Sequence, residues 1–262
     1  TWSFTRGSQD GQFAAYDLTY SSNINFGAPN IEKAPGMVTY QAAGEGISLD
    51  VNFVQKGAYL EASGTIENAS GNDRGIVLEY VLPLAESPST FSSRINETVT
   101  INSSEQIESN VFPIAAMCSA NSGRAIAIPP DEPRIFGVTG GTGGLGIKFY
   151  LGLTPDTVNF PDSASFKFII YPVDKDWGFR SALDRYYEFY PEFYSVRPDT
   201  EGGWGGIGLN GRVPPNIEDY AFNRAPLGSQ IEFDLARDDA YDIYTFAYVI
   251  AGQREVKNLS EL

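Results

Sequence analysis

The side chains of this chain that could do chemistry are carboxylates. The 262 residues contain no histidine, so a Ser-His-Asp triad, a Cys-His pair or a histidine-ligated zinc or iron site cannot be built from this chain alone. The single cysteine, Cys118, lies in the apolar run VFPIAAMCSA, and we expect a buried structural thiol there. Any catalysis would therefore use carboxylates or a metal ion that carboxylates bind.

Two adjacent acidic pairs are the first candidates for such chemistry. Asp131-Glu132 and Asp238-Asp239 could each supply oxygen ligands to calcium, but no segment has the ligand spacing of an EF-hand loop. Solvated turns explain both pairs more simply. We therefore expect no metal site and no cofactor.

A glycine-rich segment at residues 141–146, GTGGLG, formally matches the dinucleotide fingerprint GxGxxG. That fingerprint needs a helix after it, so that the helix amides meet the pyrophosphate. Here the glycines precede IKFYLGL, which has the composition of a strand. The segment therefore predicts a glycine hairpin.

The composition limits the kinds of molecule that this chain could bind. The chain has 33 acidic and 18 basic residues and a formal charge of −15, which argues against nucleic acid and anionic membranes. Its 13% aromatic content suits stacking in a core or against sugar rings, so an oligosaccharide or polysaccharide partner is possible. No apolar run reaches the ~18 residues that span a bilayer. Because the chain begins with Thr1 rather than Met, we expect an exported, extracellular or periplasmic protein.

The first two thirds of the chain has the two-residue period of β-strands. Ile47, Leu49, Val51 and Phe53 alternate strictly with polar residues, so one face of that strand should be buried. About a dozen such segments favour two packed antiparallel sheets. The predicted strands are 13–18, 37–42, 47–53, 59–67, 76–82, 97–102, 111–117, 124–128, 134–138, 145–153 and 165–171.

One strong helical pattern follows the strands. The apolar positions are spaced i, i+3, i+4, i+7, i+8 and i+11, which predicts an amphipathic helix of about four turns. Asp176 could cap its start, and Pro191 stops it. The preceding sheets are the nearest surface for its apolar face, and the alternative is a helical linker between two domains. The face consists of Phe179, Ala182, Leu183, Tyr186, Tyr187 and Tyr190.

After Pro198 the composition changes again. Residues 202–210 could form a strand rich in small residues, and residues 212–223, RVPPNIEDYAFN, read as a polar loop with two prolines. Residues 231–239 predict a short helix or an irregular segment. Residues 241–250, YDIYTFAYVI, are typical of a fully buried parallel strand. This tail resembles the beginning of a second, α/β domain.

Three runs carry a family resemblance: GTIENASGNDRGIVLEYVLPL, the block from residue 151 to residue 194, and GGWGGIG. They resemble the N-terminal part of large glycoside-hydrolase-like proteins, in which a β-supersandwich similar to galactose mutarotase precedes a helical linker and a (β/α)8 barrel. The resemblance implies a mainly β chain with a two-layer antiparallel β-supersandwich at 1–174. It also implies a linker helix region at 175–200 and an incomplete α/β tail at 201–262, the start of a truncated barrel.

The same resemblance suggests where sugar would bind. Asn210, Glu218 and Asp219 follow the first barrel strand and could line the mouth of a complete barrel, although an acidic solvated loop is the simpler interpretation. Trp204 could stack on a sugar ring or pack a domain junction. Barrel glycosidases place their catalytic carboxylates on loops that follow several different strands of the barrel. This chain would supply only the first two of those strands. The catalytic residues therefore stay unassigned.

Two hypotheses from different classes remain, with a weaker third. The first is a carbohydrate-associated, non-catalytic supersandwich module of a larger glycoside-hydrolase-like enzyme, whose partner is the remainder of the barrel. The second is a complete carbohydrate-active enzyme that uses carboxylates in a sandwich cleft. The third is a structural or protein-interaction module.

Overall fold

The structure, a computed structural model, describes residues 11–84, 88–101, 106–156, 161–195, 201–205, 209–226 and 230–248. The chain divides into two compact units, Thr1–Tyr194 and Ser195–Leu262, and each is described by itself. In the described part of the chain, no helix has both the length and the apolar character needed to cross a membrane.

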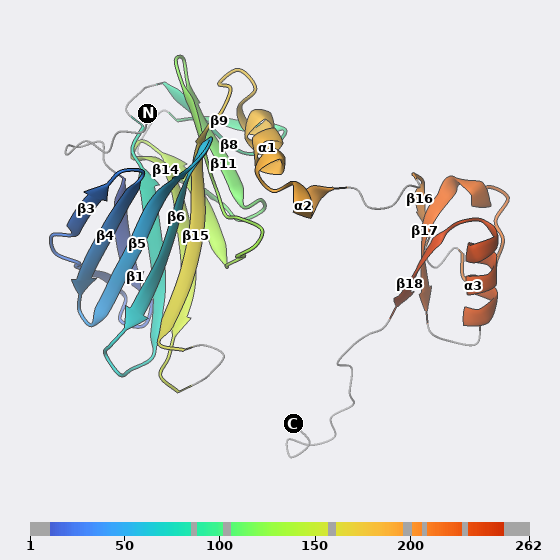
Figure 1. Cartoon of the computed structure of the whole chain (residues 1–262), viewed down its shortest axis with the longest axis horizontal. Coiled ribbons are helices and arrows are strands. Elements are labelled where there is room, and N and C mark those ends of the chain that lie inside the picture. Colours follow the sequence, from blue (N-terminus) through green and yellow to red (C-terminus); the bar gives the residue numbers. More distant parts are fainter. Residues whose placement is uncertain are drawn as a thin grey trace. The chain divides into compact units, whose positions relative to one another are not determined.

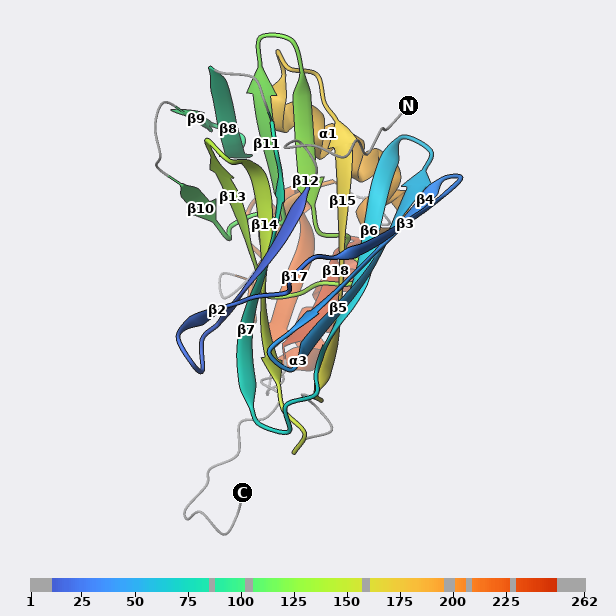
Figure 2. The ribbon, with the colours of Figure 1, turned by 90° about the vertical axis from the view of Figure 1, so that its left-hand side faces the viewer.

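The first unit is built from two antiparallel sheets that face each other (Figures 1 and 2). The six-stranded sheet has the order β10 (Ile107–Ser109), β13 (Phe136–Gly141), β14 (Gly144–Leu153), β7 (Arg74–Leu82), β1 (Gln12–Asp17) and β2 (Ser22–Ile24). The nine-stranded sheet has the order β3 (Asn30–Ala34), β4 (Met37–Gly44), β5 (Ile47–Lys56), β6 (Tyr59–Asn68), β15 (Ser163–Pro172), β12 (Gly123–Ala127), β11 (Ile114–Ser119), β8 (Ser89–Arg94) and β9 (Glu97–Ile101). This confirms the mainly β fold and the two-layer antiparallel arrangement.

The main core lies between the two sheets. Leu49, Val51 and Phe53 of β5 point inward, as their alternation predicts. Aromatic rings from both sheets meet there, and the centroids of Tyr80 and Phe168 lie 4.7 Å apart. At about 1.5–3 kcal/mol for each buried large side chain, this layer supplies most of the stability of the sandwich.

A second core lies on the outer face of the nine-stranded sheet, where helix α1 (Gly178–Phe189) packs on β11 and β12 (Figure 1). The hydroxyl of Tyr186 donates to the carbonyl of Ile128 over 2.7 Å, and that of Tyr171 donates to the carbonyl of Ala182 over 2.9 Å. The expectation that the apolar helix face lies against the preceding sheets is confirmed for five of its six residues and is wrong for Tyr187, which is 42% exposed. A short helix, α2 (Pro191–Tyr194), follows at the proline that ends α1.

The start of α1 differs from the prediction. Asp176 is not its cap: Trp177 holds the N-cap position and makes no side-chain capping bond. The reason is a turn just before the helix, in which the Asp174 carboxylate accepts from the Asp176 amide over 2.8 Å and Gly178 N–H donates to the Asp174 carbonyl over 2.9 Å. Asp176 instead pairs with Lys175 over 2.7 Å.

The predicted strands agree with the structure where they carry core residues. They differ from it at some strand ends and omit several short or polar strands. The glycine segment forms the predicted hairpin, with Gly141 paired to Gly144. The strand predicted at 134–138 begins at Phe136, because Arg134 turns away to bond Ser165 and Ile135 is 74% exposed. The strand predicted at 111–117 likewise begins only at Ile114. Strands β2, β3, β8 and β10 were not predicted, since they are short, polar or exposed.

The second unit contains a parallel sheet in the order β16 (Gly203–Gly205), β17 (Tyr220–Pro226) and β18 (Tyr244–Tyr248), with 3-10 helix η1 (Ile217–Asp219) and helix α3 (Ile231–Ala240). The helix at 231–239 is thus confirmed. The polar-loop interpretation of 212–223 is wrong at its end, because residues 220–223 belong to β17. The strand expected at 241–250 is parallel but not fully buried, since Tyr244 is 45% exposed. Residues 206–208 and 249–250 of the predicted strands lie outside the described residues.

We predict that the second core holds the first unit together. Tyr186→Ala should lower the free energy of unfolding by about 3–5 kcal/mol, because it removes a fully buried ring and its hydrogen bond to the Ile128 carbonyl. Urea unfolding followed by far-ultraviolet circular dichroism measures this. Tyr187→Ala on the exposed side of the same helix is the control and should cost less than about 1 kcal/mol. Equal losses in the two variants would contradict the prediction.

Candidate functional site

The outer face of the nine-stranded sheet stays open across β3, β4, β5 and β6, and it carries a row of polar side chains. The register places Asn30, Gln41, Asp50 and Thr65 directly opposite one another on successive strands. Side chains alternate along each strand, so these four share the face turned away from the main core. The row crosses four strands at one level.

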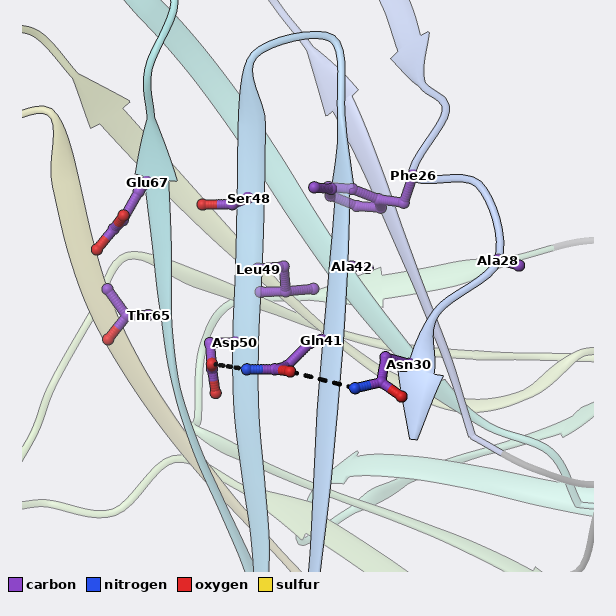
Figure 3. A pocket seen from close by; sticks show the side chains of 11 residues that line it. Phe26, Ala28, Asn30, Gln41, Ala42, Ser48, Leu49, Asp50, Thr65 and Glu67 are labelled. Atoms are coloured by element: carbon purple, nitrogen blue, oxygen red, sulfur yellow. Dashed lines mark hydrogen bonds between the residues drawn. The ribbon is translucent and has the colours of Figure 1, made fainter. Parts of the chain in front are cut away.

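Hydrogen bonds within the row fix the side chains. The Gln41 amide donates to the Asp50 carboxylate over 2.7 Å, and the Asn30 amide donates to the Gln41 carbonyl oxygen over 3.4 Å (Figure 3). One level further along the same two strands, Thr39 donates to Asn52 over 2.9 Å. Cross-strand bonds of this kind orient side chains that would otherwise sample several rotamers.

This row lines a depression of about 520 Å³, which we call the polar pocket. Its other polar groups are the hydroxyl of Ser48 and the carboxylate of Glu67 (Figure 3). Among the described residues that line it there is no lysine or arginine. The two carboxylates, of Asp50 and Glu67, therefore disfavour anionic ligands, whereas hydroxyl donors find acceptors here.

An apolar cavity of about 660 Å³ lies beside the polar pocket, on the inner side of β3. Phe13, Tyr40 and Phe53 line it, and burial raises the pKa of Tyr40. The ring centroids of Phe13 and Tyr40 are 5.1 Å apart. Asn30 lines both cavities, so the edge strand β3 separates a polar surface from an aromatic one.

Another set of polar groups, around Glu108, lies on the six-stranded sheet. The Lys148 ammonium donates to the Glu108 carboxylate over 2.6 Å, and the hydroxyl of Tyr150 also donates to it. Burial raises the pKa of Glu108, but these two donors outweigh it and lower the pKa overall. Burial and the adjacent carboxylate raise the pKa of Tyr150 to about 12. Glu108 is thus engaged in a fixed ion pair and is poorly placed to act as a free acid or base.

The sequence-predicted site residues all belong to the second unit. Trp204 is 63% exposed, and its ring stacks on that of Phe246 with a centroid distance of 5.8 Å and an interplanar angle of 9°. Phe222 and Tyr244 continue the stack on the same face of the sheet, 5.9 Å apart. We call these four residues the aromatic face. Trp204 is therefore one member of a row of rings.

Glu218 and Asp219 are exposed in η1, immediately before β17. Because Tyr220 pairs in parallel with Gly203, both carboxylates lie at the amino ends of β16 and β17. In a (β/α)8 barrel the catalytic loops lie at the carboxyl ends of the strands. Asn210 is half-buried in a turn after β16, and its Oδ1 atom is buried and has no hydrogen-bond partner among the described residues.

A buried ion network joins α3 to the sheet and to this turn. Arg237 pairs with Asp234 over 2.8 Å and with Asp238 over 2.6 Å, and the second Asp238 oxygen accepts from Asn223 and Thr245. The solvated-turn interpretation of Asp238 is therefore wrong, because its side chain is fully buried. Arg237 also donates to the carbonyls of Leu209 and Arg212, so the network holds the turn that carries Asn210.

The other acidic pair also has partners. The Asp131 carboxylate lies 3.0 Å from the Lys167 ammonium, and Glu132 pairs with Arg134 over 3.1 Å. In the described part of the chain, no group of three or more Cys, Asp or Glu side chains could hold a metal ion. The Cys118 thiol is buried, as expected, and burial raises its pKa.

The polar pocket was missed by sequence reasoning. Alternation in β5 already indicated that Ser48, Asp50 and Asn52 face away from the core. The register with β3, β4 and β6 could not be read from the sequence, because it depends on which strands pair. Only that register brings Asn30, Gln41 and Asp50 into one row.

Comparisons with known proteins give likenesses of fold. Neither the scan of protein-family models nor the search of curated proteins found a match. Among solved structures, a variant GH36 α-galactosidase from Geobacillus stearothermophilus, in complex with stachyose, matches with a TM-score of 0.54 and 10% identity, covering 94% of this chain and 46% of that one. The α-galactosidase from Lactobacillus brevis matches with a TM-score of 0.51 and 9% identity, covering 93% and 44%.

These likenesses show the fold. The fold of this chain, with its two-layer antiparallel β-sandwich, is similar to that of part of the GH36 α-galactosidases. This chain spans less than half the length of those enzymes.

We predict that the ion network is essential to the second unit. Asp238→Asn should destabilise that unit by about 3–5 kcal/mol, because it leaves the buried Arg237 without one of its two carboxylates. Hydrogen exchange of the β17 and β18 amides reports on this unit separately from the sandwich. Asp239→Asn, at the exposed neighbouring residue, should change protection by less than about 0.5 kcal/mol. Unchanged exchange in Asp238→Asn would refute the prediction.

Proposed function

We propose that this chain is a carbohydrate-associated, non-catalytic supersandwich module of a larger glycoside-hydrolase-like enzyme. The observation that carries the proposal is the polar pocket on the open face of the sandwich, with its fixed row of amide, carboxylate and hydroxyl groups. Its ligand class is a neutral oligosaccharide. Sugar hydroxyls both donate and accept, and the row offers amide donors beside carboxylate and hydroxyl acceptors.

Charge supports a neutral ligand over an anionic one. The described residues lining the polar pocket include two carboxylates, and the whole chain carries a formal charge of −15. A phosphorylated or nucleic acid ligand would meet like charge at the site. A neutral sugar meets no such repulsion. It loses hydrogen bonds to water on binding, and the fixed polar groups of the pocket replace them.

The engagement of three sandwich carboxylates supports the non-catalytic part of this proposal. Glycosidases use two carboxyl groups facing the scissile bond, one as acid and one as base or nucleophile. In the sandwich, Asp50 is bonded to Gln41, Glu108 to Lys148 and Glu132 to Arg134. The alternative, a complete enzyme that uses carboxylates in a sandwich cleft, would need a free pair.

We further propose that the second unit begins a (β/α)8 barrel. Strands β16, β17 and β18 are parallel, and α3 connects β17 to β18. Parallel strands are normally covered on both faces, and the aromatic face is the kind of surface that further strands would enclose. On this proposal Trp204 and Asn210 belong to the barrel, and export to an extracellular or periplasmic location remains part of the hypothesis.

The binding proposal predicts an effect of disrupting the polar row. Gln41→Ala should weaken binding of a neutral tetrasaccharide about 5–13-fold, because it removes an amide and frees Asp50, at roughly 1–1.5 kcal/mol for the lost hydrogen bond. Isothermal titration against stachyose, cellotetraose and xylotetraose measures the affinity.

The matched control is Thr39→Ala, which removes the cross-strand bond one level along the same two strands and lies outside the polar pocket. It should leave affinity unchanged. Equal weakening in both variants would indicate a general effect on the sheet. Absence of heat for every sugar at millimolar concentration would leave the sandwich with a purely structural role.

The barrel proposal predicts that the protein in its native source is longer than this chain. Intact-mass spectrometry of that protein should give a mass well above that of 262 residues, because the aromatic face needs further strands to cover it. A mass equal to that of this chain would refute the barrel and favour a role for the two units alone.

A further inference from the structure

A third cavity of the first unit, at the start of α1, is lined by an exposed tryptophan. Trp177 is 63% exposed, whereas Phe179, two residues later, is only 3% exposed and packs in the second core. Gly178 between them has a φ of +49°, a left-handed conformation that glycine adopts without strain. The backbone therefore turns Trp177 outward at the point where Phe179 turns inward.

The exposed indole is held on an ordered turn. Asp174 N–H donates to the Ser181 hydroxyl over 3.0 Å, and the Asp174 carboxylate accepts from the Asp176 amide. The carbonyl of Trp177 accepts from the Arg180 amide over 3.1 Å. Binding of a ligand that stacks on this ring would cost little conformational entropy, because the backbone beneath the ring is already ordered.

The cavity beside Trp177 has a volume of about 410 Å³, within the roughly 300–1,000 Å³ range of small-molecule sites. Thr90 and Ser92 of β8 and Thr98 of β9, three residues with hydroxyl groups, also line it. Ser92 and Thr98 lie 2.9 Å apart, next to an irregularity in the β8–β9 register. Arg180 adds a guanidinium donor to the lining.

We propose that this cavity, the Trp177 site, binds one pyranose ring of a neutral oligosaccharide. The apolar C–H face of the ring stacks on the indole of Trp177. Its hydroxyls reach Ser92 and Thr98, which can both donate and accept, and the Arg180 donor. The inference rests on the proposed carbohydrate role of the module but uses residues distinct from those of the polar pocket.

A nucleotide base could also stack on an indole, but the net charge of the chain opposes it. Lys175, Asp176 and Arg180 all line the cavity, and the Asp176 carboxylate lies 2.7 Å from the Lys175 ammonium, which lowers the positive charge that Lys175 offers to a phosphate. The formal charge of −15 adds a general repulsion. A neutral ligand with an apolar face and several hydroxyls fits the combination better.

The test uses the full chain with stachyose, cellotetraose and xylotetraose as probes, followed by titration calorimetry and tryptophan fluorescence. Trp177→Ala should weaken binding of the tetrasaccharide that binds by at least about tenfold and remove its fluorescence change. Trp177→Phe, which keeps an aromatic ring, should retain most of the affinity. Tyr187→Ala, an exposed aromatic residue of the same helix outside the cavity, should bind like the unchanged chain.

The outcomes separate the two sites. If Gln41→Ala abolishes binding and Trp177→Ala has no effect, the Trp177 site is wrong while the proposed function stands. If Trp177→Ala abolishes binding and Gln41→Ala has no effect, the polar pocket is wrong and the Trp177 site stands. Binding by none of the three sugars overturns both. If Trp177→Ala does not fold, Trp177→Phe takes its place in the test. The Trp177 site is overturned if adding sugar leaves the tryptophan fluorescence unchanged both in the parent chain and in Trp177→Phe.

Discussion

Burial of both faces of the nine-stranded sheet at β11, β12 and β15 is the constraint on which the rest of the first unit depends. In β12 and the residue after it, the inward positions are Ile126 and Ile128, which join the main core, and the outward positions are Ala125 and Ala127, which join the second core. Alanine leaves room for a helix to approach the strand closely. Without α1, this stretch of sheet would expose an apolar surface that only a partner could cover. The helix therefore stabilises the sheet by covering this apolar surface, and the sheet provides the surface on which the helix packs.

The same constraint explains where a polar site can form. α1 covers one part of the outer face, and the part across β3 to β6 has no helix on it within the described residues (Figure 2). Outward side chains there must be polar to stay in water, and the cross-strand pairs Gln41–Asp50 and Thr39–Asn52 satisfy one another. A row of oriented amides and carboxylates is therefore a consequence of leaving this face open. The entry of the chain into α1 then determines where Trp177 is displayed.

The sequence predicted those features that depend on period and burial. The apolar face of α1 and the alternation of β5 follow from side chains that must leave water, so periodicity alone finds them. The capping of α1 could not be found in this way, because it depends on how Asp174 and Gly178 shape the preceding turn. Strand β17 was missed because Asn223 looks like a loop residue, yet its amide is buried and bonded to Asp238. Local polarity is a poor guide where a partner distant in sequence satisfies it.

The second unit inverts the usual distribution of polarity about a sheet. On the side that α3 covers, the buried residues include the charged groups Asp234, Arg237 and Asp238, whereas the other side carries Trp204 and Phe246 in contact with water. A buried ion pair adds little net stability compared with apolar packing, since desolvation offsets most of the attraction. Its effect here is geometric, because Arg237 can satisfy two carboxylates and two carbonyls only if the turn at 209–212 lies in one position. The network therefore specifies the conformation of the turn at 209–212, which on the proposed barrel would lie after the first strand, on the side where barrel enzymes place the groups that meet their substrates.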